Sequence, residues 1–96
     1  MTGQATVSAH SIDSIVNELD RFHQRATYGA VATLLNRAPR NLMQGRSRSA
    51  RDSWIVSGGT GLPTGYEPEQ MHPEIRSRET IIRIAGELGA WLENPS

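Results

Sequence analysis

The chain has 96 residues, and its ten acidic and ten basic side chains give a formal net charge of zero at pH 7. This length fits one small domain, which buries only about 60 to 65% of the surface that its unfolded chain exposes. Cysteine is absent and every basic residue is an arginine. The first fact excludes disulfides, thiolate metal sites and a thiol nucleophile, and the second favours contacts with phosphates or carboxylates.

Residues 1–10 lack the basic and apolar stretches of a targeting signal, and nowhere do 18 apolar residues follow one another. We therefore expect a flexible N-terminus over residues 1–10 and a single domain over residues 11–94. A cytoplasmic protein without membrane contacts fits this pattern and the missing cysteines. The sequence leaves the oligomeric state open.

Two helices are predicted in the first third of the domain. Over residues 11–24, apolar side chains recur at helical spacing after Ser11, which is a capping residue, and Ser14 is a second capping candidate. A second, shorter helix is predicted to start at a Thr27 cap and to end near Asn36. Val31, Leu34 and Leu35 are its inward-facing residues.

Residues 38–45 predict a third, short helix. Pro39 suits the first helical position, Gly45 suits the stop, and Leu42 and Met43 are the apolar anchors. Two short helices joined by a few residues indicate a helix-turn-helix. The polar segment 46–53 that follows is predicted to be a loop.

The remainder of the domain predicts a small hairpin and a C-terminal helix. Residues 54–57 have strand composition, 58–61 read as a turn, and 62–66 return as a weaker strand interrupted by Pro63. From Ser77 to Pro95 apolar residues again recur at helical spacing. The predicted fold is therefore α+β and mostly helical, with a helix-turn-helix, a β-hairpin and a C-terminal helix in a winged-helix-like order.

Five arginines and no carboxylate lie within residues 37–51. The interpretation that needs no function is a solvated basic loop. The functional interpretation is a nucleic-acid contact, because asparagine, glutamine and arginine match base edges while further arginines meet phosphates. The predicted contact residues are Tyr28, Arg37, Arg40, Asn41, Gln44, Arg46, Arg48 and Arg51.

Other chemistry finds little support in the sequence. The glycine-rich segment 57–61 lacks the lysine of a phosphate loop, so a hairpin turn is favoured. The three histidines are His10, His23 and His72; they have no ligand spacing, and His23 is expected to help end the first helix. We expect no metal, no cofactor and no enzymatic activity.

The order of these signals resembles a known family. Thr-Tyr-Gly at 27–29, the Pro-led segment ending in Gly-Arg at 39–46, and the strand and glycine turn at 54–65 are similar to the DNA-binding domain of the alkylguanine-DNA alkyltransferases and alkyltransferase-like proteins. The resemblance covers residues 25–66. It implies a winged-helix-like domain that meets duplex DNA through the minor groove, with Tyr28 at the position of the family tyrosine.

The chain departs from that family where the chemistry occurs. Leu42 stands at the position of the family's arginine finger, and residues 50–57, where the resemblance places the active-site segment, hold neither a cysteine nor a histidine. Alkyl transfer needs a thiolate, so the expected function is non-enzymatic binding of duplex DNA. The alternative is a protein-interaction module whose arginines dock an acidic partner.

Overall fold

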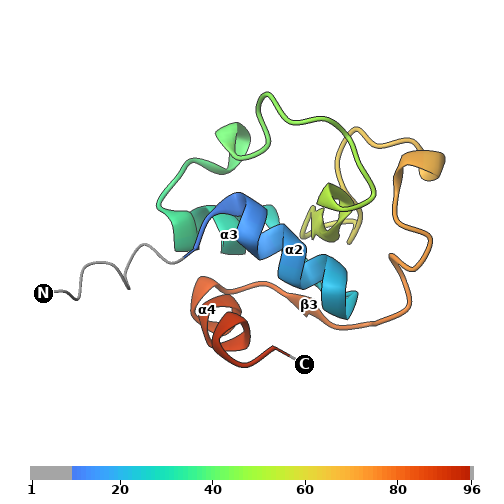
Figure 1. Ribbon diagram of the computed structural model, residues 1–96. Coiled ribbons are helices and arrows are strands. Elements are labelled where there is room, and N and C mark those ends of the chain that lie inside the picture. The colour runs from blue at the N-terminus through green and yellow to red at the C-terminus, as the bar shows by residue number, and fades with distance from the viewer. Residues whose placement is uncertain (1–9, 96) are drawn as a thin grey trace, which may run out of the picture.

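The computed structural model describes residues 10–95 (Figure 1). Its helices are α2 (Ile12–Phe22), α3 (Tyr28–Leu35) and α4 (Ala85–Glu93), its strands are β1 (Arg25–Thr27), β2 (Ile55–Val56) and β3 (Ile81–Ile82), and its short 3-10 turns are η1 (Pro39–Asn41), η2 (Asp52–Trp54) and η3 (Pro68–Gln70). The expected α+β, mostly helical class is confirmed for this part of the chain. Residues 1–9 of the predicted flexible terminus lie outside the described residues.

Helix α2 begins at the predicted Ser11 cap, and Ser14, the second capping candidate, completes a reciprocal pair. Ser11 Oγ accepts the backbone N–H of Ser14, and Ser14 Oγ accepts that of Ser11. At the other end His23 takes a left-handed φ of 55° and its N–H bonds to the Leu19 carbonyl. This closure confirms that His23 ends the helix, and it turns the chain directly into β1.

Helix α3 follows β1 without a connecting loop. The Thr27 hydroxyl accepts the N–H of Ala30, and Asn36 closes the helix with a φ of 58°. Both predicted ends are therefore confirmed. Because β1 is the central strand, Tyr28 is fixed where the sheet ends and the helix begins.

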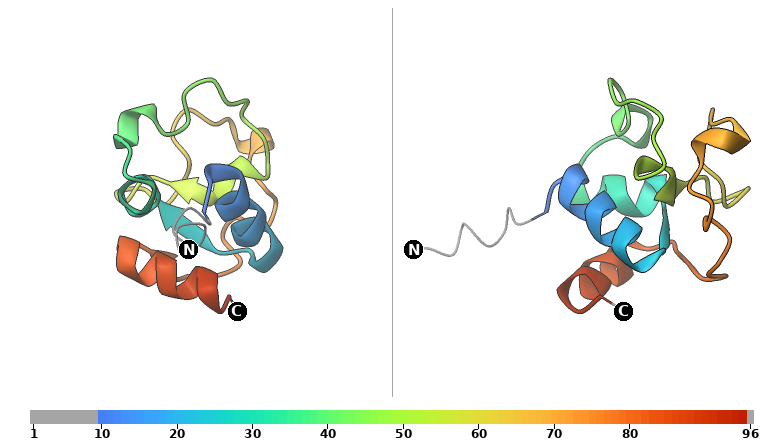
Figure 2. Two further views of the ribbon diagram at one scale, coloured as in Figure 1. Left: turned by 60° about the vertical axis from the view of Figure 1, so that its left-hand side comes forward. Right: turned by 45° about the vertical axis from the view of Figure 1, so that its right-hand side comes forward.

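The sheet has the order β2-β1-β3, and both pairings are parallel. Figure 2 shows β1 and β2 side by side. The predicted hairpin over residues 54–66 is wrong, because β2 pairs with β1 and the chain then folds on itself. Ser57 donates to the Leu62 carbonyl and Gly61 donates to the Ser57 carbonyl, so the glycine segment is a closed loop and residues 62–66 form no strand.

The C-terminal helix is also shorter than predicted, since it starts at Ala85 and not near Ser77. Ile81 and Ile82 instead pair with Arg25 and Ala26 as an edge strand. Isoleucine is β-branched and favours a strand. The unpaired edge of β1 offers backbone hydrogen bonds to residues 81–82, which stabilise the strand. Ile84, which lies inside the predicted helix, instead precedes Ala85 as the N-cap residue and is 59% exposed.

The predicted third helix does not form an α-helix. After η1 the chain continues as successive turns, in which Gln44 donates to the Asn41 carbonyl and Arg46 to the Met43 carbonyl. Gly45 takes a φ of 81°, in keeping with its role as a stop. With only two adjacent apolar anchors, the segment has too little to bury for a full helix to be stabilised by packing.

The core lies between the helices and the sheet. Trp54 is fully buried together with Ile15, Leu19 and Val31. Helix α4 packs against α3, and residues 36–54 arch over the opposite side of the molecule (Figure 1). Among the described residues no helix is long and apolar enough to cross a membrane.

Candidate nucleic-acid interface

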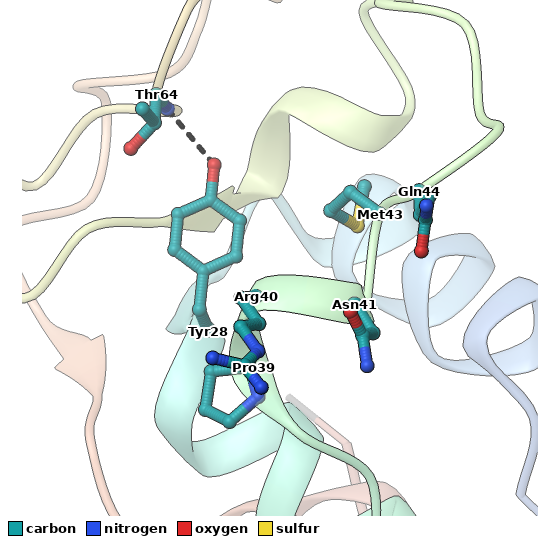
Figure 3. A pocket seen from close by; sticks show the side chains of 7 residues that line it. All are labelled: Tyr28, Pro39, Arg40, Asn41, Met43, Gln44 and Thr64. Atoms are coloured by element: carbon teal, nitrogen blue, oxygen red, sulfur yellow. Dashed lines mark hydrogen bonds between the residues drawn. The ribbon is translucent and has the colours of Figure 1, made fainter.

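An open pocket of about 620 Å³ lies beside the start of α3 (Figure 3). Figure 3 shows the Tyr28 hydroxyl directed at Thr64 on one side, while the turns after Pro39 carry polar side chains on the other. The structure thus brings together Tyr28, Arg40, Asn41 and Gln44, half of the predicted contact residues. The pocket is lined by Tyr28, Pro39, Arg40, Asn41, Met43, Gln44 and Thr64.

A second hollow of about 270 Å³ adjoins this pocket. The two share Tyr28, Met43 and Thr64, and the second adds Gly45, Arg46, Ser47, Arg48 and Tyr66. We call the combined surface the Tyr28 groove. Arg40 belongs to one end of the groove and Arg48 to the other.

The Tyr28 hydroxyl is held by one hydrogen bond. The backbone N–H of Thr64 donates to Tyr28 Oη at 2.8 Å. No described residue accepts the proton of this hydroxyl, so Tyr28 keeps a donor for an incoming acceptor. The half-buried ring itself forms a wall of the groove.

Arg46 lines the second hollow, and its guanidinium is engaged by two carboxylates. Its guanidinium donates to both carboxylate oxygens of Asp52, at 2.7 and 3.1 Å, and to Asp13 Oδ1 at 2.8 Å. Asp52 is nearly buried, with 4% of its side chain exposed. Arg46 therefore fastens the loop to the beginning of α2.

Arg51 is also held by intramolecular contacts. It donates to Asp13 Oδ1 at 3.0 Å and to Asn17 Oδ1 at 2.7 Å. The segment 37–51 holds no carboxylate of its own, but α2 and η2 supply two. These ion pairs stabilise the fold, and the roles of Arg46 and Arg51 at a phosphate backbone stay predictions. Both are intramolecular ion-pair residues.

These contacts shift the ionisation of the participating groups. The hydrogen bonds and charge of Arg46, with a smaller contribution from Arg51, hold the pKa of Asp13 below its ordinary value. Hydrogen bonds to Asp52 and Asp13 raise the pKa of Arg46 despite its partial burial. Both groups stay charged at neutral pH, so the ion pairs persist there.

Three predicted arginines remain exposed, namely Arg37, Arg40 and Arg48. Among the described residues none of these guanidiniums has an ion-pair or hydrogen-bond partner. Arg48 lies against Gly65, where an added Cβ would come within 3.2 Å of its Nη2. Asn41 and Gln44 are exposed as well, and Leu42 is buried on the other side of the turns as predicted.

No pattern in the sequence predicted Thr64 and Tyr66 as groove residues. Tyr66 donates to the Ser49 carbonyl and accepts the Ser49 N–H, which ties segment 62–66 to the arginine-rich loop. Burial raises the pKa of Tyr66. Sequence patterns cannot reveal the contact between Tyr66 and Ser49, because both residues lie in loops without apolar periodicity.

The described residues hold no group of three or more His, Asp or Glu side chains placed to bind a metal ion. Comparisons of the chain with protein-family models, curated proteins and solved structures find no match.

Proposed function

We propose that the protein binds duplex DNA through the Tyr28 groove. The observation that carries the proposal is the pair of free guanidiniums, Arg40 and Arg48, at the two ends of a groove whose wall holds an uncommitted Tyr28 hydroxyl donor. Arginine and tyrosine donors are typical partners of phosphate oxygens. Phosphate contacts by Arg37, Arg40, Arg48 and Tyr28 position the DNA.

Asn41 and Gln44 face the same groove and supply the contacts to base edges. Each carries an amide that donates and accepts side by side, and so can pair with the donors and acceptors of base edges. They stand on turns, so the proposal needs no recognition helix inserted in a groove. The winged-helix-like and alkyltransferase-like character remains part of the proposal, supported by the Thr27-capped helix that precedes a Pro-led segment.

The ionic-strength dependence provides the sharpest test. Log K is expected to fall with log salt by roughly 0.9 for each phosphate neutralised, so three free arginines predict a slope of about −2.7. Participation of all five arginines of segment 37–51 predicts about −4.5 by the same rule. Fluorescence anisotropy of a labelled duplex at several salt concentrations measures this slope.

Variants locate the contact. Arg40→Ala and Arg48→Ala are each expected to weaken binding several-fold and to reduce the slope by about 1. The matched control is Arg21→Ala, which removes the same charge from an exposed position on α2 outside the groove. An equal loss in all three variants, or no binding at low salt, contradicts the proposal. Capture of an acidic protein that survives nuclease treatment would favour the protein-docking alternative.

A further inference from the structure

Arg25 is a buried cation in the centre of the sheet. It is 8% exposed, and its Nη1 and Nη2 donate to the carbonyls of Gly61 and Arg78, each at 2.9 Å. Its Nε is buried without a hydrogen-bond partner. Both acceptors are neutral, whereas buried charges in proteins are normally paired with an opposite charge.

The charged neighbours of Arg25 increase this imbalance. Burial first, and then the positive charges of Arg76 and Arg83, lower the pKa of Arg25. Both neighbours are exposed. Among the described residues no carboxylate forms an ion pair with any of the three arginines. Arg25 and Arg83 both donate to carbonyls of loop 57–61, and Arg76 is close enough for its charge to act on Arg25.

The closed loop 57–61 forms one side of this cluster. Arg83 Nη1 donates to the Gly58 carbonyl at 2.9 Å, and Arg25 Nη1 lies 3.2 Å from the position that a Cβ of Gly61 would take. Small residues at 58 and 61 thus let two guanidiniums approach the loop backbone. Among the described residues, nothing accepts a hydrogen bond from the remaining N–H groups of Arg83 or from the Arg76 side chain, so these groups can meet a ligand.

We propose that Arg25, Arg76 and Arg83, together with loop 57–61, form a binding site for a phosphate dianion, either free phosphate or a phosphomonoester. Arg76 and Arg83 donate hydrogen bonds to its oxygens, and Arg25 contributes charge from the protein interior, where screening is weak. Three positive charges balance a dianion better than the single charge of a phosphodiester. The site shares no residue with the Tyr28 groove, so it does not rest on the proposed DNA binding.

The first test is a titration of the full chain with inorganic phosphate at constant ionic strength, balanced with sodium chloride. Amide signals of residues 57–61 and the Nε–H signals of the arginines report the binding. A saturable shift of these signals is expected, whereas a linear response equal to that of chloride overturns the site.

Variants and ligand analogues complete the test. Arg83→Gln and Arg76→Gln, both at exposed positions, are each expected to weaken phosphate binding at least tenfold, and the control Arg21→Gln leaves it unchanged; two variants guard against a folding defect in one. Phenyl phosphate should bind and dimethyl phosphate should not. Equal binding of the diester overturns the preference for a dianion, and an undiminished affinity in both glutamine variants overturns the location.

Discussion

Arg46 Nη2 donates a hydrogen bond of 2.8 Å to Oδ1 of Asp13, a residue 33 positions earlier in the chain. The same guanidinium donates twice to Asp52. One arginine thus joins the beginning of α2, the arginine-rich loop and η2. This relationship divides the five arginines of segment 37–51 into two that hold the fold and three that remain exposed.

Removing the charge of Asp52 is expected to destabilise the protein. Asp52→Asn leaves Arg46 partly buried with a neutral acceptor, and the loss should be roughly 1 to 3 kcal/mol of unfolding free energy. Urea denaturation measures it. Asp13→Asn is the matched control, because Asp13 is exposed and exposed ion pairs contribute little to stability. An equal loss of unfolding free energy in the two variants would show that the burial of Asp52 does not strengthen its ion pair with Arg46.

The Asp13 ion pairs predict a dependence of stability on pH. The pKa of Asp13 is lower in the folded protein than its ordinary value of 3.8, so the unfolded chain binds this proton more readily. The stabilisation is complete above pH 3.8 and is lost as the pH falls through the lower folded value. The difference in urea midpoint between the wild type and Asp13→Asn should therefore be constant near neutrality and vanish in acid. A difference that grows in acid contradicts this assignment.

Gly45 and Gly65 make a matched pair, because both take a left-handed φ, of 81° and 79° respectively. Alanine at either position should cost about 1 kcal/mol of stability. A Cβ at Gly45 meets nothing within 4 Å, whereas at Gly65 it comes within 3.2 Å of Arg48 Nη2. Gly65→Ala should therefore also displace Arg48 and weaken DNA binding in the anisotropy titration. Gly45 lines the groove, but its Cβ would displace no side chain, so Gly45→Ala should weaken binding less. Equal affinities of the two variants would argue against Arg48 as a contact.

Gly89 lies inside α4 and offers a stabilising substitution. A Cβ there would lie 3.5 Å from Leu34 Cδ1, an ordinary van der Waals contact. Gly89→Ala is expected to raise the unfolding free energy by about 0.5 to 1 kcal/mol, since alanine loses less backbone entropy in a helix. A thermal or urea unfolding curve measures the change. A lower midpoint would mean that α3 and α4 require the glycine for their close approach.

The local ends of α2 and α3 follow from the sequence alone. Ser11, Ser14 and Thr27 cap helices with their own hydroxyls, and each bond spans only three residues. Apolar spacing likewise identifies Ile15 and Leu19 as core residues. Such signals are readable because the interacting groups are neighbours in the chain.

Only the tertiary structure determined the strand pairing of the sheet and the ion-pair partners of the arginines. Ile81 and Ile82 have the spacing of a helix, yet they form a strand because β1, more than 50 residues earlier, presents a free edge. Segment 37–51 looks free of acid in the sequence, but folding brings Asp13 and Asp52 to Arg46 and Arg51. Hydrogen-bond edges and opposite charges act through space, so their partners are fixed only when distant parts of the chain have packed together.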